Sequence, residues 1–164
     1  MRPKTILIMG PTACGKSALA HAMAKKHPIE IIAVDSVSIY KDMDIASAKP
    51  SLSEQQAVPY HLIDICSPDQ KYSVAAFVKD ARAAIKDIHQ RGKHALLVGG
   101  TMMYFNALCY GLDPIPEITP EYNQQAAEKI AKLGLPSIHQ ELQTIDPVAL
   151  AQINPNDQQR LHRV

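Results

Sequence analysis

The sequence is poor in cysteine and lacks the cysteine and histidine spacings that hold metal ions. Its three cysteines, Cys14, Cys66 and Cys109, are odd in number and widely spaced, which favours reduced thiols over a disulfide framework. No apolar stretch approaches the length of a membrane span, and the run at residues 5–9 is too short for a signal peptide. We therefore expect a cytoplasmic protein with no membrane contact.

A strong charge of either sign is also missing. The 17 basic and 16 acidic residues leave a formal net charge of +1, so composition alone gives no nucleic-acid footprint, although a local basic patch would not show in the sum. The sequence contains no internal repeats and no low-complexity segment. Its 164 residues, 46% of them hydrophobic, are enough for one domain with a sizeable core.

A glycine-rich motif near the N-terminus is the most specific feature that is present. Residues 10–17 match G-x-x-x-x-G-K-[ST] in full. The apolar run at residues 5–9 precedes the motif and a helical pattern over residues 18–26 follows it, which is the strand–loop–helix context that the motif requires. In order, its residues are Gly10, Pro11, Thr12, Ala13, Cys14, Gly15, Lys16 and Ser17.

The chemistry of this motif is anion binding. Glycines let the backbone turn several N–H groups inward, and the start of a helix adds the positive end of its dipole. Lys16 supplies a mobile positive charge and Ser17 supplies a hydroxyl for Mg2+. The motif predicts a bound di- or triphosphate, and it does not say whether that compound is ATP or another.

The apolar pattern predicts an α/β fold. Continuous apolar runs at residues 5–9, 29–34 and 95–98 are typical of buried parallel strands with helices on both faces. Helices are expected between and after them, with Ser73 and Thr101 as N-caps. We predict a P-loop NTPase-like open parallel sheet flanked by helices.

The pattern changes near residue 114, beyond which only helices are expected. We place a phosphate-loop α/β core at residues 1–113 and the start of an all-helical insertion subdomain at residues 114–164. The last helix shows no stop signal before Val164, so we expect the subdomain to be truncated there. The expected starts of its helices are Pro120, Pro136, Asp146 and Asn156.

Polar residues follow two of the predicted strands. Asp35 comes directly after one strand, and Gly99, Gly100 and Thr101 end another. In open parallel sheets these ends line the ligand crevice. Asp35 is a candidate for holding Mg2+ through water, for accepting a proton as a general base, or for capping a turn. Lys49, by contrast, is expected to be structural or a surface residue, as is Asp64.

Together with later blocks, the sequence resembles the tRNA dimethylallyltransferases. This family transfers a prenyl group from dimethylallyl diphosphate to an adenine beside the anticodon. Pro-Thr-Ala after Gly10 is distinctive of its phosphate loop. The other matching blocks are Asp35-Ser36 with Tyr40, residues 43–45 and 48–50, Pro59 with residues 61–64, residues 73–77, residues 99–101 with Tyr104, Asp146-Pro147, Asn156-Asp157, and Gln159 to Leu161 with Arg163.

The resemblance implies that the loop holds a diphosphate that leaves, rather than ATP. Lys16 and Mg2+ would neutralise the charge of the leaving diphosphate, with Ser17 as a metal ligand. Thr101 would lie near this metal ligand. Asp35 would accept a proton from the adenine amino nitrogen, and Lys16, Asp35 and Thr101 would be the catalytic residues. The partners implied are dimethylallyl diphosphate and the anticodon stem-loop of tRNA, and we expect a monomer. The residues implied to contact tRNA are Asp35, Ser36, Val37, Ser38, Thr101, Asn123, Gln159, Arg160, Leu161, His162 and Arg163.

The chain departs from the family pattern at several positions. Ser38 stands where the family usually has glutamine, Asn123 where it often has arginine, and Ala46 where it usually has glycine. Two alternatives therefore stay open. One is a small-molecule phosphate-loop kinase, which the loop and Asp35 alone would fit equally well, although no arginine-rich lid is obvious. The other is a catalytically impaired diphosphate-binding remnant.

Overall fold

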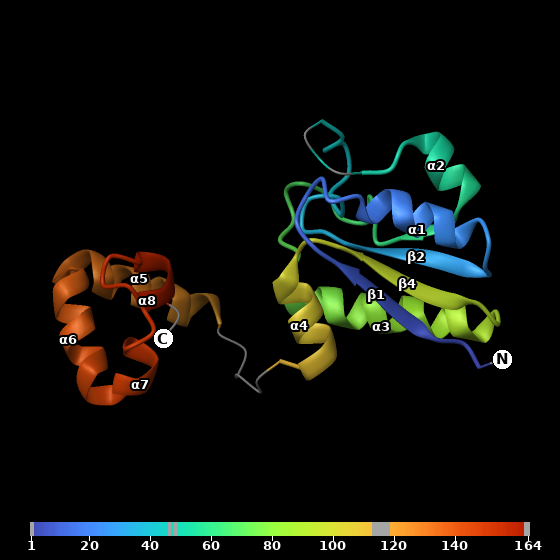
Figure 1. Cartoon of the computed structure of the whole chain (residues 1–164). Coiled ribbons are helices and arrows are strands. Elements are labelled where there is room, and N and C mark those ends of the chain that lie inside the picture. Colours follow the sequence, from blue (N-terminus) through green and yellow to red (C-terminus); the bar gives the residue numbers. More distant parts are fainter. Residues whose placement is uncertain (1, 46, 48, 113–118, 163–164) are drawn as a thin grey trace. The chain divides into compact units, whose positions relative to one another are not determined.

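A computed structural model describes residues 2–45, 47, 49–112 and 119–162. By its internal contacts the chain divides into two compact units, Met1–Asp113 and Pro114–Val164. The first unit holds a parallel β-sheet, and the second consists of helices (Figure 1).

The sheet has the strand order β1-β4-β2-β3, with every pair parallel. Its strands are β1 (Thr5–Met9), β2 (Ile29–Val34), β3 (Tyr60–His61) and β4 (His94–Gly99). All six residues of β2 are buried, as a strand covered on both faces requires. The predicted α/β fold with an open parallel sheet is therefore confirmed.

Helices cover both faces of the sheet (Figure 1). Helix α1 (Lys16–Ala24) lies on one face, over side chains such as that of Ile31. Helices α3 (Val74–Gln90) and α4 (Met102–Tyr110) lie on the other face, in a core that includes the fully buried Phe77. Because alternate residues of a strand point to opposite faces, both cores use the same strands, and the sheet is fixed rigidly beneath its loops.

Two short elements between β2 and α3 have no counterpart in the sequence prediction. Helix α2 (Leu52–Ala57) has no buried residue and is defined at its start by a capping box between Ser51 and Glu54. Strand β3 has only two residues, which pair with Ile31 and Ile32 of β2. Neither element carries the apolar periodicity on which the prediction depends.

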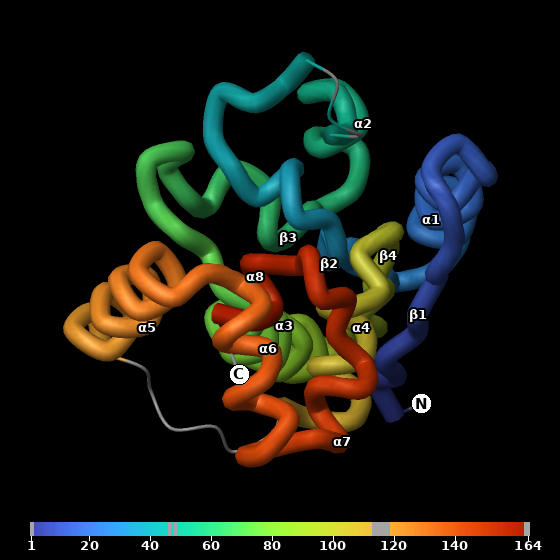
Figure 2. Tube along the Cα trace, turned by 90° about the vertical axis from the view of Figure 1, so that its left-hand side faces the viewer, coloured from blue at the N-terminus to red at the C-terminus, as the bar shows by residue number. Residues whose placement is uncertain are grey.

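The second unit contains helices α5 (Pro120–Leu133), α6 (Leu135–Ile145), α7 (Pro147–Leu150) and α8 (Gln158–Leu161). Helices α7 and α8 both pack against α6 (Figure 2). The helix expected to run from near Asn156 to the chain end instead spans Gln158–Leu161, with Asp157 as its N-cap. In the described part of the chain no helix has both the length and the apolar character needed to cross a membrane.

Candidate active site

The phosphate loop joins β1 to α1 and turns sharply where the helix begins. Gly15 precedes the helix with φ of 87°, a left-handed conformation that glycine adopts without steric cost. The Lys16 ammonium folds back over the loop, donates to the carbonyl of Pro11 and lies 3.7 Å from the sulfur of Cys14. The Lys16 ammonium therefore lies beside the start of a helix, a position that favours anions.

A cavity of about 450 Å³ opens beside this loop. Its wall includes Lys16 and Ser17 from α1, Asp35 and Ser38 from the segment after β2, and Gly100 after β4. The structure thus brings the phosphate loop and both predicted strand ends to one cavity, because the strands are parallel and finish at the same edge of the sheet.

Asp35 is held by its own turn. Its Oδ1 accepts hydrogen bonds from the backbone N–H groups of Val37 (2.8 Å) and Ser38 (3.1 Å). The turn-capping role is therefore present, and it fixes the orientation of the carboxylate. Since a carboxylate has two oxygens that accept, Oδ2 can still receive a proton.

Thr101 is the N-cap residue of α4, as predicted, but its side chain makes no capping hydrogen bond there. Its hydroxyl oxygen instead accepts a hydrogen bond from the backbone N–H of Ser36 (3.1 Å). The end of β4 lies beside the end of β2. The Thr101 hydroxyl therefore accepts from a backbone N–H next to β2 rather than from one in its own helix. Thr101 thereby joins two strand ends at the cavity.

Gly99 makes this close approach of β4 and β2 possible. A Cβ at this position would lie 1.9 Å from the carbonyl oxygen of Val34, its register partner. Only glycine leaves room for the two backbones at the rim of the cavity.

Ser38 presents a buried hydroxyl to the cavity. The residue is only 3% exposed and lines the cavity wall. Within the described residues its Oγ has no hydrogen-bond partner. Leaving a buried polar group unpaired costs about 1–3 kcal/mol, so a bound molecule that supplied the partner would recover that free energy.

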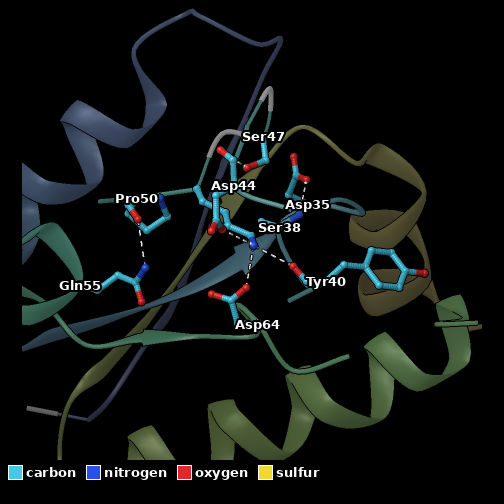
Figure 3. Close-up of polar contacts among 9 residues, drawn as sticks. Asp35, Ser38, Tyr40, Asp44, Ser47, Pro50, Gln55 and Asp64 are labelled. Carbon is cyan, nitrogen blue, oxygen red and sulfur yellow. Dashed lines mark hydrogen bonds and ion pairs between the residues drawn. The ribbon is translucent and has the colours of Figure 1, made fainter. Parts of the chain in front are cut away.

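Lys49 and Asp64, expected to be structural or surface residues, form an ion-paired cluster together with Asp44 (Figure 3). Lys49 lines the cavity and its side chain is only 5% exposed, whereas the side chains of Asp64 and Asp44 are 42% and 73% exposed. The Lys49 ammonium donates to Asp64 Oδ1 (2.6 Å), Asp44 Oδ1 (2.8 Å) and the carbonyl of Tyr40 (2.7 Å). Burial lowers the pKa of Lys49, but the two carboxylates outweigh it and raise that pKa above its ordinary value. The ammonium is therefore charged and fully engaged.

A second polar pair lies in the same cavity and was given no role from the sequence. The ring Nε2 of His21, on α1, lies 2.6 Å from the hydroxyl of Tyr60, on β3. Burial raises the pKa of Tyr60 to about 12, so the phenol stays neutral in the physiological range.

The site also fits a magnesium ion bound together with a phosphate. No group of three or more histidine, cysteine, aspartate or glutamate side chains that could hold a metal occurs among the described residues. Magnesium does not need one, because it commonly takes one or two protein oxygens and completes its shell with phosphate and water. Ser17 and Asp35 line the same cavity and offer such oxygens.

The residues expected to contact tRNA in the second unit lie at its surface, with one exception. Gln159 and Arg160 are exposed. The Nε of Arg160 lies 3.4 Å from Asp157 Oδ2. His162 Nε2 lies 3.0 Å from the carbonyl oxygen of Asn123, so two predicted positions come together. Leu161 is only 3% exposed and belongs to the helical core, so its side chain is not at the surface of the unit.

Two predicted positions cannot be placed. Arg163 and Ala46 lie outside the described residues.

The fold and the cavity define an α/β protein with an all-parallel sheet and a cavity at the carboxyl ends of its strands. Comparison with known families is more specific: the model of the family described as IPP transferase matches residues 38–164. The chain therefore belongs to the IPP transferase family.

Solved structures agree with this assignment. A tRNA isopentenylpyrophosphate transferase from Bacillus halodurans is 38% identical, with a TM-score of 0.65 over 98% of this chain and 53% of that one. The tRNA delta(2)-isopentenylpyrophosphate transferase from Staphylococcus epidermidis is 36% identical, with a TM-score of 0.63 over 98% of this chain and 53% of that one. A eukaryotic dimethylallyltransferase acting on tRNA is 30% identical, with a TM-score of 0.80 over 98% of this chain and 40% of that one. This chain spans about half the length of these proteins.

Proposed function

We propose that the protein transfers a dimethylallyl group from dimethylallyl diphosphate to the exocyclic amino group of an adenine next to the anticodon in tRNA. The observation that carries the proposal is the placement of the Asp35 carboxylate and the phosphate loop on one cavity. Family membership and the tRNA-acting relatives support it. The protein then acts as a monomeric prenyltransferase in the cytoplasm, and it binds tRNA at the anticodon stem-loop.

In the first part of the reaction the loop receives the donor. The Lys16 ammonium and the backbone N–H groups of residues 10–17, other than Pro11, hold the diphosphate oxygens, and the dipole at the start of α1 adds to their attraction. Ser17 would hold Mg2+ against the same oxygens, and the ion would supply neutralisation of the leaving group's charge. These contacts strengthen as negative charge grows on the leaving oxygen, so they favour the transition state over the bound donor.

In the second part the adenine nitrogen becomes a nucleophile. Its lone pair forms a bond to C1 of the prenyl group while the C1–O bond to diphosphate breaks, and the electron pair of that bond leaves with the diphosphate. The nitrogen then carries one proton too many, and Asp35 accepts it. The backbone N–H groups of Val37 and Ser38 hold this carboxylate in place, and Thr101 fixes Ser36 beside it.

The acceptor has contacts on both units in this proposal. Ser36, Val37 and the buried hydroxyl of Ser38 contact the base on the side of the cavity opposite the loop. In the helical unit, Asn123, Gln159, Arg160 and His162 contact the RNA, and Arg160 does so as a phosphate ligand.

The test is the choice of donor and of product. The protein is incubated with an anticodon stem-loop RNA and either dimethylallyl diphosphate with a labelled prenyl group or ATP with a labelled γ-phosphate, and digested nucleosides are identified by mass spectrometry. We expect a prenyl group on the amino nitrogen of one adenine and no label from ATP. Phosphoryl transfer from ATP to a small acceptor, with no prenyl transfer, would instead make the protein a kinase.

A further inference from the structure

Two lysine side chains line the cavity, and their surroundings differ. Lys16 is in the phosphate loop, and its ammonium rests on the carbonyl of Pro11. That neutral carbonyl is readily exchanged for a charged phosphate oxygen. Lys49 comes from the loop after β2, and its side chain is only 5% exposed.

The Lys49 ammonium has no donor left for a phosphate. An ammonium carries three donors, and Lys49 directs them to Tyr40, Asp44 and Asp64 at 2.6–2.8 Å. The cluster holds one positive and two negative charges, so its net charge is negative and it repels an anion at short range. Lys49 is therefore not a diphosphate ligand, although it lines the same cavity.

The partners of Lys49 lead instead to the acceptor side of the cavity. Lys49 holds the Asp64 carboxylate, and the backbone N–H of Asp64 donates to the carbonyl of Ser38 (3.1 Å). The backbone N–H of Ser38 in turn donates to Asp35 Oδ1 (3.1 Å). One hydrogen-bonded path thus connects the buried lysine to the carboxylate, and Figure 3 shows Asp35, Ser38 and Asp64 along it.

Asp64 is unusual within this path. Its φ is 55°, in the left-handed region that is costly for residues other than glycine and asparagine or aspartate. In this conformation Asp64 is held at two points: Lys49 binds its side chain, and the carbonyl of Ser38 accepts from its backbone N–H. The same contacts hold residues 38–41 against residues 64–66, where Tyr40 and Cys66 form a parallel bridge.

We propose that Lys49 and Asp64 are positioning residues that hold Ser38, and through it the Asp35 carboxylate, in the geometry needed by the acceptor amino group, without contacting the donor. This inference rests on the proposed function for the roles of donor and acceptor. It separates the two cavity lysines: Lys16 acts on the diphosphate and Lys49 acts on the acceptor side.

The experiment compares Lys49→Met and Asp64→Asn with two lysine controls in the otherwise unchanged protein. Methionine keeps the length of the side chain and removes the charge, and asparagine tolerates the left-handed backbone while weakening the ion pair. Lys16→Met removes the proposed diphosphate ligand. Lys93→Met removes another ion pair to a buried carboxylate, that of Glu30 (3.0 Å), and so controls for a general loss of stability.

Three quantities are measured: the affinity for inorganic diphosphate by calorimetry, kcat and KM for the RNA in prenyl transfer, and hydrogen exchange of the Val37 and Ser38 amides. For Lys49→Met we expect diphosphate affinity within twofold of the wild type, a fall in kcat/KM for RNA of about 10- to 100-fold, and faster exchange at both amides. Asp64→Asn should change the same quantities in the same direction and less strongly. The double variant should resemble Lys49→Met alone, because both substitutions break one path.

Other outcomes overturn the inference. A loss of diphosphate affinity in Lys49→Met comparable to that in Lys16→Met would make Lys49 a phosphate ligand. Unchanged amide exchange in both Lys49→Met and Asp64→Asn would mean that the cluster does not position Ser38 and Asp35. The same effects in Lys93→Met would mean that the cluster contributes only to general stability. If Lys49→Met does not fold, Asp64→Asn decides on the same three quantities. A wild-type protein that transfers no prenyl group refutes the proposed function, whereas the exchange and calorimetry still test the positioning path.

Discussion

Replacing Gly99 by alanine should damage the sheet and the cavity together. The added Cβ would lie 1.9 Å from the carbonyl oxygen of Val34 and 2.8 Å from its Cβ, and real Cβ contacts are essentially never under 3.0 Å. The ends of β4 and β2 would have to separate by about 1 Å, given the gap between 1.9 and 3.0 Å. Both strands are buried in the centre of the sheet, so the clash cannot relax into solvent.

Overpacking of this kind costs about 1–3 kcal/mol, and the rigid backbone partner places Gly99→Ala at about 3 kcal/mol. With a urea m-value of about 2 kcal/mol per M, the unfolding midpoint should fall by about 1.5 M. The matched control is Gly100→Ala, whose Cβ would lie 3.4 Å from the carbonyl oxygen of Gly10 and should cost less than about 1 kcal/mol. Urea titrations followed by circular dichroism measure both. Equal midpoints for the two variants would refute the argument that Gly99 is required by the close approach of the strands.

Other consequences of the structure can be measured separately. Lys16→Met should weaken the binding of inorganic diphosphate about 100-fold, in line with the loss of a charged hydrogen bond, and calorimetry showing unchanged affinity would contradict the role of the loop. Thr101→Val removes the acceptor for the Ser36 N–H and should lower kcat about 10-fold with little change in diphosphate affinity, while Thr101→Ser should stay near wild type; equal kinetics for both variants would speak against it. Hydrogen bonding by Arg91 holds the pKa of the buried Glu30 carboxylate at about 2, below its ordinary 4.5. Its contribution to the free energy of unfolding, about 3 kcal/mol, is therefore present above pH 4.5 and lost as pH falls through about 2. The free energy of unfolding of Glu30→Gln, measured by denaturation across this pH range, should not show that loss. Identical pH dependence in Glu30→Gln and the wild type would show that the pKa of Glu30 is not lowered by folding.

The strands and the phosphate loop were predictable because their signals are local. A buried parallel strand such as β2 is a continuous apolar run, and the loop at residues 10–17 is a motif with a fixed length. The parallel order then follows from the topology, and with it the meeting of Asp35 and the loop at one cavity. The side of the cavity formed by the loop could therefore be predicted from the sequence.

The acceptor side depends on contacts between distant residues. Lys49 and Asp64 are 15 positions apart, and neither belongs to a periodic segment, so nothing local distinguishes them from surface charges. The signal that could have found them is the coincidence of a lysine and an aspartate in two adjacent loops after parallel strands. The contact of the Thr101 hydroxyl was missed for a similar reason, since it accepts a hydrogen bond from Ser36, which follows another strand.

The helical unit shows the limit for short elements. Leu161 was grouped with its polar neighbours as a contact residue, but α8 spans only Gln158–Leu161 and turns Leu161 into the core. In a helix of one turn, a single apolar residue gives no periodicity from which to read the buried face.

The central claim is that the phosphate loop holds the leaving diphosphate while Asp35 takes the proton of the acceptor. The most direct measurement is single-turnover prenyl transfer to a stem-loop RNA by wild type and Asp35→Asn, with inorganic diphosphate affinity determined on the same preparations. We predict that Asp35→Asn slows transfer at least about 100-fold, within the range of general-base contributions, and keeps diphosphate affinity within twofold. Transfer at the wild-type rate by Asp35→Asn would contradict the account, because the carboxylate would then not be the proton acceptor.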